Sequence, residues 1–154
     1  RSEFKGGQIF KSPVKISDNG SLYALTNENN LWKANVDGSS EIYDLQITNL
    51  NAEILSYDNG FYIADGSVLS FILNREKVRI KIDFDSPIKS LSYASGFLAV
   101  LTSSSLYLLK DNKLMEGFPI DTDGYFNIFD IDNDGKLNLI NIKNRFIYNY
   151  KLIY

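Results

Sequence analysis

The chain contains no cysteine and no histidine, and these absences exclude several kinds of chemistry. Without cysteine there is no disulfide framework and no zinc site built on thiolates. Without histidine the chain lacks the commonest general base, the commonest transition-metal ligand and the usual Ser-His or Cys-His nucleophile pair. No other catalytic constellation is evident in the sequence. We therefore expect a protein that is not an enzyme, with no catalytic residues.

Charge and hydrophobicity exclude two further classes of partner. Sixteen basic and nineteen acidic residues give a net charge of −3, with no basic stripe. A nucleic-acid partner is therefore not expected, because its phosphates require clustered positive charge. The longest apolar run, "GFLAVLTSSSLYLL", is interrupted by Thr102 and three serines. It falls short of the roughly 20 apolar residues of a membrane span, so none is predicted.

Length and composition indicate an ordinary globular domain. The chain has 154 residues, of which 44% are hydrophobic and 23% charged. This is enough to bury a core and argues against disorder. The sequence begins "RSEFKGG", without methionine or a signal peptide. We expect a mature or excised piece of a longer product.

Short apolar runs separated by turn residues predict an all-β fold. No stretch keeps the 3.6-residue period of an amphipathic helix. Runs rich in Ile, Val, Leu, Tyr and Phe instead alternate with Asn-Gly, Asp-Gly and Ser-Gly turns. This pattern is typical of many short antiparallel strands.

Four of the turn glycines are evenly spaced. Gly20, Gly60, Gly96 and Gly135 lie 40, 36 and 39 residues apart, each between two short apolar runs. A third run follows about ten residues later, and in the first three repeats a polar turn leads to a fourth. Four strands in about 40 residues is the period of a β-propeller blade. We predict one propeller-like domain, or part of one, with repeats at 11–49, 50–86, 87–124 and 125–154.

The two ends of the chain leave the closure of the propeller open. The fourth repeat stops at Tyr154 without a fourth strand, and the N-terminal "EFKGGQIF" has no partner in the first repeat. The N-terminal segment could complete the last blade and close a small ring. The chain could instead be an arc whose edges pair with missing blades or with another chain. A two-sheet sandwich also fits several short, evenly spaced strands.

The stretch "DIDNDGKLNLI" carries more charge than its turn requires. The other three repeats have no aspartate at the positions of Asp130, Asp132 and Asp134. Alternating carboxylates before a glycine match the first half of a calcium-binding loop. The next ligands would be the carbonyl of Lys136 and the side chain of Asn138. The alternative is an aspartate-rich turn that water solvates.

Two other features have functional and structural interpretations. Asp83 and Asp85 stand two residues apart, so a strand would place both carboxylates on one face, as acid–base chemistry on a glycan requires. A solvated outer face explains the pair equally simply and is the favoured interpretation. The sole tryptophan, Trp32, could stack on a sugar, but packing between blades is the better interpretation.

The last forty residues resemble a known repeat family. "NIFDIDNDGKLNLINIKNRFIYNYKL" is similar to the FG-GAP or VCBS-type repeats of bacterial β-propellers, whose core reads roughly D-x-D-x-D-G-x-x-D before an apolar strand. The resemblance implies a structural Ca²⁺ ion held by Asp130, Asp132, Asp134, Lys136 and Asn138. The family prefers aspartate at the position of Asn138. The resemblance also implies an extracytoplasmic location: periplasmic, cell-surface or secreted.

These observations together predict a non-catalytic binding or scaffold module of the β-propeller type, from a secreted or cell-envelope bacterial protein. Its partner would be a protein or a glycan, with self-association or pairing to missing blades as a further expectation. The rival hypothesis is a fragment of a polysaccharide-acting enzyme, a glycosidase or a lyase, that uses carboxylates such as Asp83.

Overall fold

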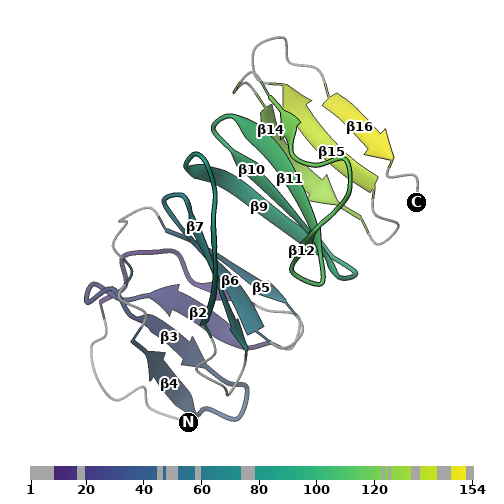
Figure 1. Cartoon of the computed structure of the whole chain (residues 1–154). Helices are drawn as coiled ribbons and strands as arrows, with labels where there is room; N and C mark the ends of the chain where they lie inside the picture. The colour runs from purple at the N-terminus through teal and green to yellow at the C-terminus, as the bar shows by residue number, and fades with distance from the viewer. Residues whose placement is uncertain are drawn as a thin grey trace. The chain divides into compact units, whose positions relative to one another are not determined.

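A computed structural model confirms the all-β prediction (Figure 1). It describes residues 9–16, 20–44, 47, 52–57, 60–73, 79–122, 124, 126–132, 136–141 and 147–151. These residues form strands and turns and include no helix. None of their segments therefore has the helical length and hydrophobicity that a membrane crossing would require.

Four antiparallel sheets follow one another along the chain, and each lies inside one of the predicted repeats. The first contains β1 (Lys15–Ile16), β2 (Leu22–Leu25), β3 (Leu31–Ala34) and β4 (Ser40–Tyr43). The second contains β5 (Glu53–Tyr57), β6 (Gly60–Asp65), β7 (Val68–Leu73) and β8 (Arg79–Asp83). The third contains β9 (Ile88–Ala94), β10 (Phe97–Thr102), β11 (Ser105–Lys110), β12 (Lys113–Leu114) and β13 (Ile120–Asp121). The fourth contains β14 (Phe126–Ile131), β15 (Lys136–Asn141) and β16 (Ile147–Lys151).

The chain divides into two compact units. The first comprises residues 1–65 and 70–80, and the second comprises residues 66–69 and 81–154. The first unit therefore holds the first sheet and most of the second. The third and fourth sheets belong entirely to the second unit.

The hairpins form where the sequence supplies residues that tolerate a positive φ. Between β9 and β10, Ser95 and Gly96 have φ angles of 49° and 84°. Between β11 and β12, Asp111 and Asn112 have φ angles of 50° and 63°. Two successive positive φ angles match the twist of the flanking strands, which is why such two-residue turns are preferred in hairpins.

The core of the first unit lies between its two sheets. Tyr23 and Phe61 pack with their ring centroids 5.5 Å apart, and Tyr43 meets Phe61 edge-on at 5.6 Å. The buried cluster comprises Tyr23, Leu25, Leu31, Ile47, Ile54, Phe61 and Ile63. Alternate residues of β2 and β6 supply most of it, because successive side chains of a strand point to opposite faces.

The core of the second unit has the same construction. Its buried cluster joins alternate residues of β10 and β11 to residues of β14 and β15. The members are Phe97, Ala99, Leu101, Leu106, Leu108, Ile131, Leu137 and Leu139. This buried cluster therefore lies between the third sheet and the fourth sheet, which pack against each other.

The strand before β2 is irregular. Phe10 forms an isolated bridge with Thr26, and Lys15 and Ile16 pair with Tyr23 and Leu22. Between these pairs the hydroxyl of Ser12 accepts the backbone N–H of Leu25 at 2.8 Å. The end of "EFKGGQIF" therefore runs beside β2, while residues 1–8, on which ring closure would depend, lie outside the described residues.

The expected fourth strand of the third repeat, "LMEGFPI", is divided into two short strands. β11 pairs with β12 near one end and with β13 near the other. Between them Gly117 has a φ of 83°, and the Phe118–Pro119 peptide bond is cis. Proline also has no N–H to donate to a strand neighbour, so a continuous strand cannot form there.

We expect Phe61→Ala to destabilise the first unit by about 3–5 kcal/mol, because its fully buried ring contacts two other rings. Thermal and urea unfolding, followed by circular dichroism, would measure the change. The matched control is Leu114→Ala, which truncates a side chain that is 51% exposed and should change stability little. Equal losses in the two variants would contradict this account of the core.

Candidate functional site

The predicted calcium ligands lie on the hairpin between β14 and β15. Asp130 belongs to β14 and is the cross-strand partner of Asn138 in β15. Asp132 directly follows β14, and Lys136 is the first residue of β15. Asp134 lies outside the described residues. The structure thus brings four of the five predicted ligands onto one hairpin.

Hydrogen bonds within the hairpin use two of the predicted ligand groups. The backbone N–H of Asp132 donates to the carbonyl of Lys136 at 3.0 Å. The backbone N–H of Lys136 donates to Oδ1 of Asp132 at 2.8 Å. Asp132 therefore has a role in the turn that requires no metal. These hydrogen bonds do not test calcium binding, so the calcium site stays a prediction.

No group of three or more acidic side chains that could hold a metal ion occurs within the part of the chain that the structure describes. That part excludes Asp134 and the side chain of Asp130. The absence of such a group therefore says nothing about two of the three aspartates of the predicted site.

Asp83 and Asp85 do not form a catalytic pair on one strand. β8 ends at Asp83, and Asp85 lies in the bend that follows. The carboxylate of Asp85 accepts hydrogen bonds from Ser86 at 3.3 Å and from Ser104 at 3.4 Å. Burial, together with a hydrogen bond to Asp85, raises the pKa of Tyr107. Asp85 thus links the β8–β9 bend to β11 through hydroxyl groups.

Trp32 packs within the first sheet and is only 7% exposed. Its ring centroid lies 5.0 Å from that of Phe10. Packing, rather than a sugar-stacking platform, therefore accounts for this tryptophan.

A pocket of about 360 Å³ lies in the first unit between β1 and β5, the first strands of its two sheets. Its lining combines two lysines and one glutamate with small and apolar residues. The lining residues are Lys11, Ser12, Pro13, Lys15, Ala52, Glu53 and Ile54. The pocket is an open hollow on the surface rather than an enclosed cavity, so it suits a side chain of a partner better than a buried small molecule.

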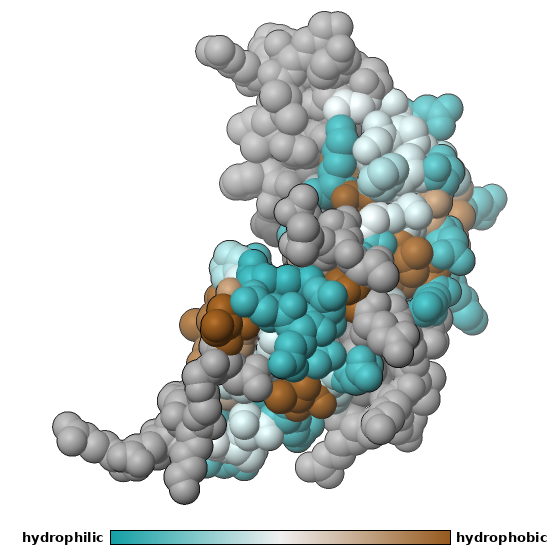
Figure 2. Space-filling model, turned by 90° about the vertical axis from the view of Figure 1, so that its left-hand side faces the viewer, coloured by the Kyte–Doolittle hydropathy of each residue, from teal (hydrophilic) through white to brown (hydrophobic). Residues whose placement is uncertain are grey.

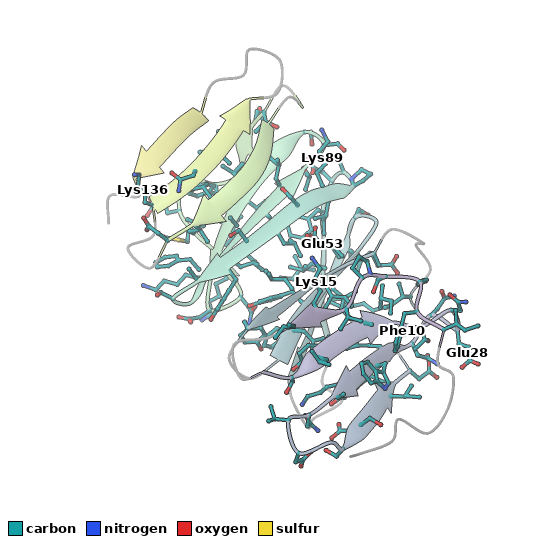
Figure 3. The ribbon with its side chains drawn as sticks, turned by 180° about the vertical axis from the view of Figure 1, so that it is seen from behind. Phe10, Lys15, Glu28, Glu53, Lys89 and Lys136 are labelled. Carbon is teal, nitrogen blue, oxygen red and sulfur yellow. The ribbon has the colours of Figure 1, made fainter. Side chains whose placement is uncertain are left out.

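Charged groups of opposite sign meet in this pocket (Figure 3). Burial raises the pKa of the Glu53 carboxyl above its usual range, and the positive charge of Lys15 offsets part of this increase. The ammonium of Lys11 donates to Oδ1 of Asn29 at 2.6 Å, which holds it at the pocket wall. A half-buried carboxyl with a raised pKa next to a cation is a common feature of binding sites.

Sequence reasoning did not find this pocket. Glu53 lies about forty residues from Lys11 and Lys15, and no motif connects them. Only the packing of the first sheet on the second brings them together. The single available signal was the Ser12–Pro13 dipeptide, which predicts an interruption in the first strand.

The fold is similar to that of about half the length of yeast Hsv2 proteins, which are β-propellers. A KlHsv2 variant with its loop 6CD replaced by a Gly-Ser linker matches 90% of this chain at 16% identity, with a TM-score of 0.64. Hsv2 of Kluyvelomyces marxianus matches 95% at 18% identity, with a TM-score of 0.66. The chain spans 48% and 49% of the length of these two structures. No protein-family model and no curated protein matches the sequence.

These comparisons confirm the β-propeller prediction and correct the predicted family. The resemblance to bacterial FG-GAP or VCBS-type repeats is wrong, because the structural relatives are yeast propellers and no model of a repeat family matches. The physical reason lies in the motif. An Asp-x-Asp-x-Asp-Gly stretch also suits an ordinary hairpin, in which Asp132 accepts a backbone hydrogen bond.

The raised pKa of Glu53 predicts a pH-dependent stability. A folded-state pKa above the unfolded value means that the folded protein binds the proton more tightly. The associated stability is therefore complete at low pH and is lost as the pH rises through the folded-state pKa. We expect Glu53→Gln to raise the melting temperature relative to wild type at pH 7, and this advantage to vanish towards pH 4.

Melting temperatures measured between pH 4 and pH 7 would test this expectation. Glu28→Gln is the matched control, because it makes the same change at an exposed turn of the same unit. The expectation fails if Glu53→Gln and Glu28→Gln change the melting temperature alike across the pH range.

Proposed function

We propose that this chain is a non-catalytic β-propeller module that binds a protein partner through an acidic segment of that partner. The observation that carries the proposal is the pocket between β1 and β5, with two lysines and a half-buried carboxyl in its lining. The fold supports it further, because propellers present binding sites on a rigid set of stacked sheets.

The charges of the pocket favour a carboxylate-bearing ligand. The ammonium groups of Lys11 and Lys15 outnumber the single carboxyl of Glu53. The raised pKa of Glu53 reduces the negative charge there further as the pH falls. A bound acidic side chain would thus meet two cations in the lining of the pocket.

A glycan-binding module and a polysaccharide-acting enzyme would each need a different kind of site. A glycan partner would be recognised by hydroxyl groups and aromatic faces rather than by paired cations. A polysaccharide-acting enzyme would use two carboxylates at a defined separation. In the structure Asp85 instead accepts hydrogen bonds from two serines, which favours a binding module.

Binding would be measured on an array of acidic peptides, their Asn/Gln counterparts and glycans, and then by fluorescence anisotropy. We expect acidic peptides to bind, and Lys15→Ala to weaken the best binder about tenfold or more, because a hydrogen bond to a charged group contributes about 1.5–3 kcal/mol. Lys113→Ala, which removes an exposed lysine of β12 outside the pocket, is the matched control.

Three results would contradict the proposed function. One is equal binding of the acidic peptides and their amide counterparts, and another is binding to glycans alone. The third is turnover in a panel of glycosidase and lyase substrates, which would end the non-catalytic interpretation.

Calcium binding at the aspartate hairpin is a second proposal about this module. Asp130, Asp132, Asp134, Lys136 and Asn138 would supply the oxygen ligands, from carboxylates, a backbone carbonyl and an amide. Three formal charges and one neutral amide place the expected affinity at roughly 10⁻⁴–10⁻³ M, the range of extracellular modules. Such a site would function outside the cytosol, so an extracytoplasmic location is part of the same proposal.

If calcium binds this hairpin, millimolar CaCl₂ should raise the melting temperature relative to chelator, because the ion binds only the folded state. Asp132→Asn should abolish the shift while it keeps the acceptor for the Lys136 N–H. Glu28→Gln removes a carboxylate elsewhere and should retain the full shift. An unchanged melting temperature in wild type would show that the hairpin is only a solvated turn.

A further inference from the structure

The segment that pairs with β2 contains two more residues than β2 offers it as partners. Phe10 is opposite Thr26, and Lys15 is opposite Tyr23. Five steps of chain, from 10 to 15, therefore face three steps, from 26 to 23. Extra residues of this kind form a bulge, which bends the strand that contains them. The bulge here lies between Lys11 and Lys15, the two lysines of the pocket.

The bulge brings the two lysines close together on the pocket side of the strand. The backbone N–H of Lys11 donates to the carbonyl of Leu25 at 2.9 Å, so Lys11 is opposite Leu25. Leu25 and Tyr23 are two residues apart in β2, and both belong to the core between the two sheets. The backbones of Lys11 and Lys15 are therefore about 7 Å apart along the strand, whereas four regular residues would span about 13 Å. Both side chains line the pocket.

The neighbours of the two lysines differ in charge. Figure 3 shows Lys15 close to Glu53, whose carboxyl its positive charge affects. The ammonium of Lys11 instead donates to Oδ1 of Asn29, in the turn after β2. An amide oxygen carries no net charge, so this contact does not neutralise Lys11. An anion between the two ammonium groups would therefore complete a series of alternating charges: Glu53, Lys15, the anion and Lys11.

The surface around these charges is uncharged. The other lining residues are Ser12, Pro13, Ala52 and Ile54. Beside them Val14 and Ile16 are 47% and 71% exposed. Figure 2 shows, for one side of the molecule, that hydrophobic and hydrophilic residues adjoin one another on the surface. A second carboxylate of the same partner segment would meet these uncharged residues or Glu53, and nothing there would offset the loss of its hydration.

We propose that the pocket accepts one carboxylate of a partner segment, held between Lys11 and Lys15, and that Glu53 excludes a second one. This inference rests on the proposed function and specifies its partner: an isolated acidic residue with uncharged neighbours, rather than a run of acidic residues. The carboxylate of Glu53 balances one of the two positive charges. One incoming carboxylate therefore makes the pocket neutral, and a second would make it negative.

The selection of one carboxylate should depend on pH. Burial raises the pKa of Glu53, so this residue gains its proton at a higher pH than an ordinary glutamate. Protonation removes the charge that excludes the second carboxylate. The other charged side chains of the lining are Lys11 and Lys15 from the first segment, while the segment of β5 contributes Glu53 alone. The exclusion should therefore weaken as the pH falls towards 4.

Fluorescence anisotropy at pH 7 would test the proposal with one uncharged peptide carrying no, one or two acidic residues. In wild type the first acidic residue should tighten binding about tenfold or more. The second should add no more than the statistical gain of two alternative binding registers. Lys11→Ala and Lys15→Ala should each lose most of the first gain, because the carboxylate lies between both lysines.

The decisive variant is Glu53→Gln, in which the second acidic residue should tighten binding severalfold. Glu116→Gln removes an exposed carboxylate of the second unit and should behave like wild type. Peptides with sulfonates in place of carboxylates keep their charge between pH 4 and pH 7. With these peptides wild type should gain affinity for the second anion towards pH 4, and Glu53→Gln should not.

The outcomes separate this inference from the proposed function. If acidic peptides bind no better than the uncharged peptide, both are overturned. If the first acidic residue tightens binding and the second adds as much again in wild type, only the inference is overturned. The same holds if Glu53→Gln matches wild type throughout. Circular dichroism would confirm that each variant is folded.

Discussion

A small sheet with apolar residues on both faces can be buried only by neighbours on both faces, and the rest of this structure follows from that constraint. β2 illustrates it: Tyr23 and Leu25 face the second sheet, while Leu22 and Ala24 face the other way. One blade cannot cover both of its own faces. The stacking of sheets is therefore the main source of stability in each unit, and every other feature has to be accommodated at the strand edges and turns.

The repeat and its hairpins were predictable because they depend on local chemistry. Positive-φ residues such as Ser95 and Asp111 fix where β9 and β11 end. The spacing of the turn glycines gave the number of sheets directly. Trp32 is buried, as expected of a single large ring in a short apolar strand, but it packs against Phe10 rather than between two sheets. Local preference and global packing agree at these positions, as they do in most foldable sequences.

The pocket could not be predicted, because it depends on contacts between distant segments. Lys15 and Glu53 carry no pattern in the sequence and meet only when two sheets stack. The aspartate hairpin has a clear sequence pattern, but that pattern has two structural interpretations. Its motif was conspicuous, but the alternating aspartates suit both a cation site and a tight turn. The hydrogen bonds of Asp132 show how the turn itself can use one of them. Likewise, the bend at Asp85 depends on Ser104, nineteen residues away.

The irregular strand at Ser12 has a second consequence. Among the described strands, β1 is the edge of its sheet, and an edge strand pairs on one side only. Here Ser12 diverts the N–H of Leu25 to a side-chain oxygen, and Pro13 has no N–H to donate. The interruption that shapes the pocket wall therefore also keeps this segment from pairing regularly with β2 along its whole length. A variant that straightened this strand would gain regular pairing within the sheet and lose the wall that shapes the pocket.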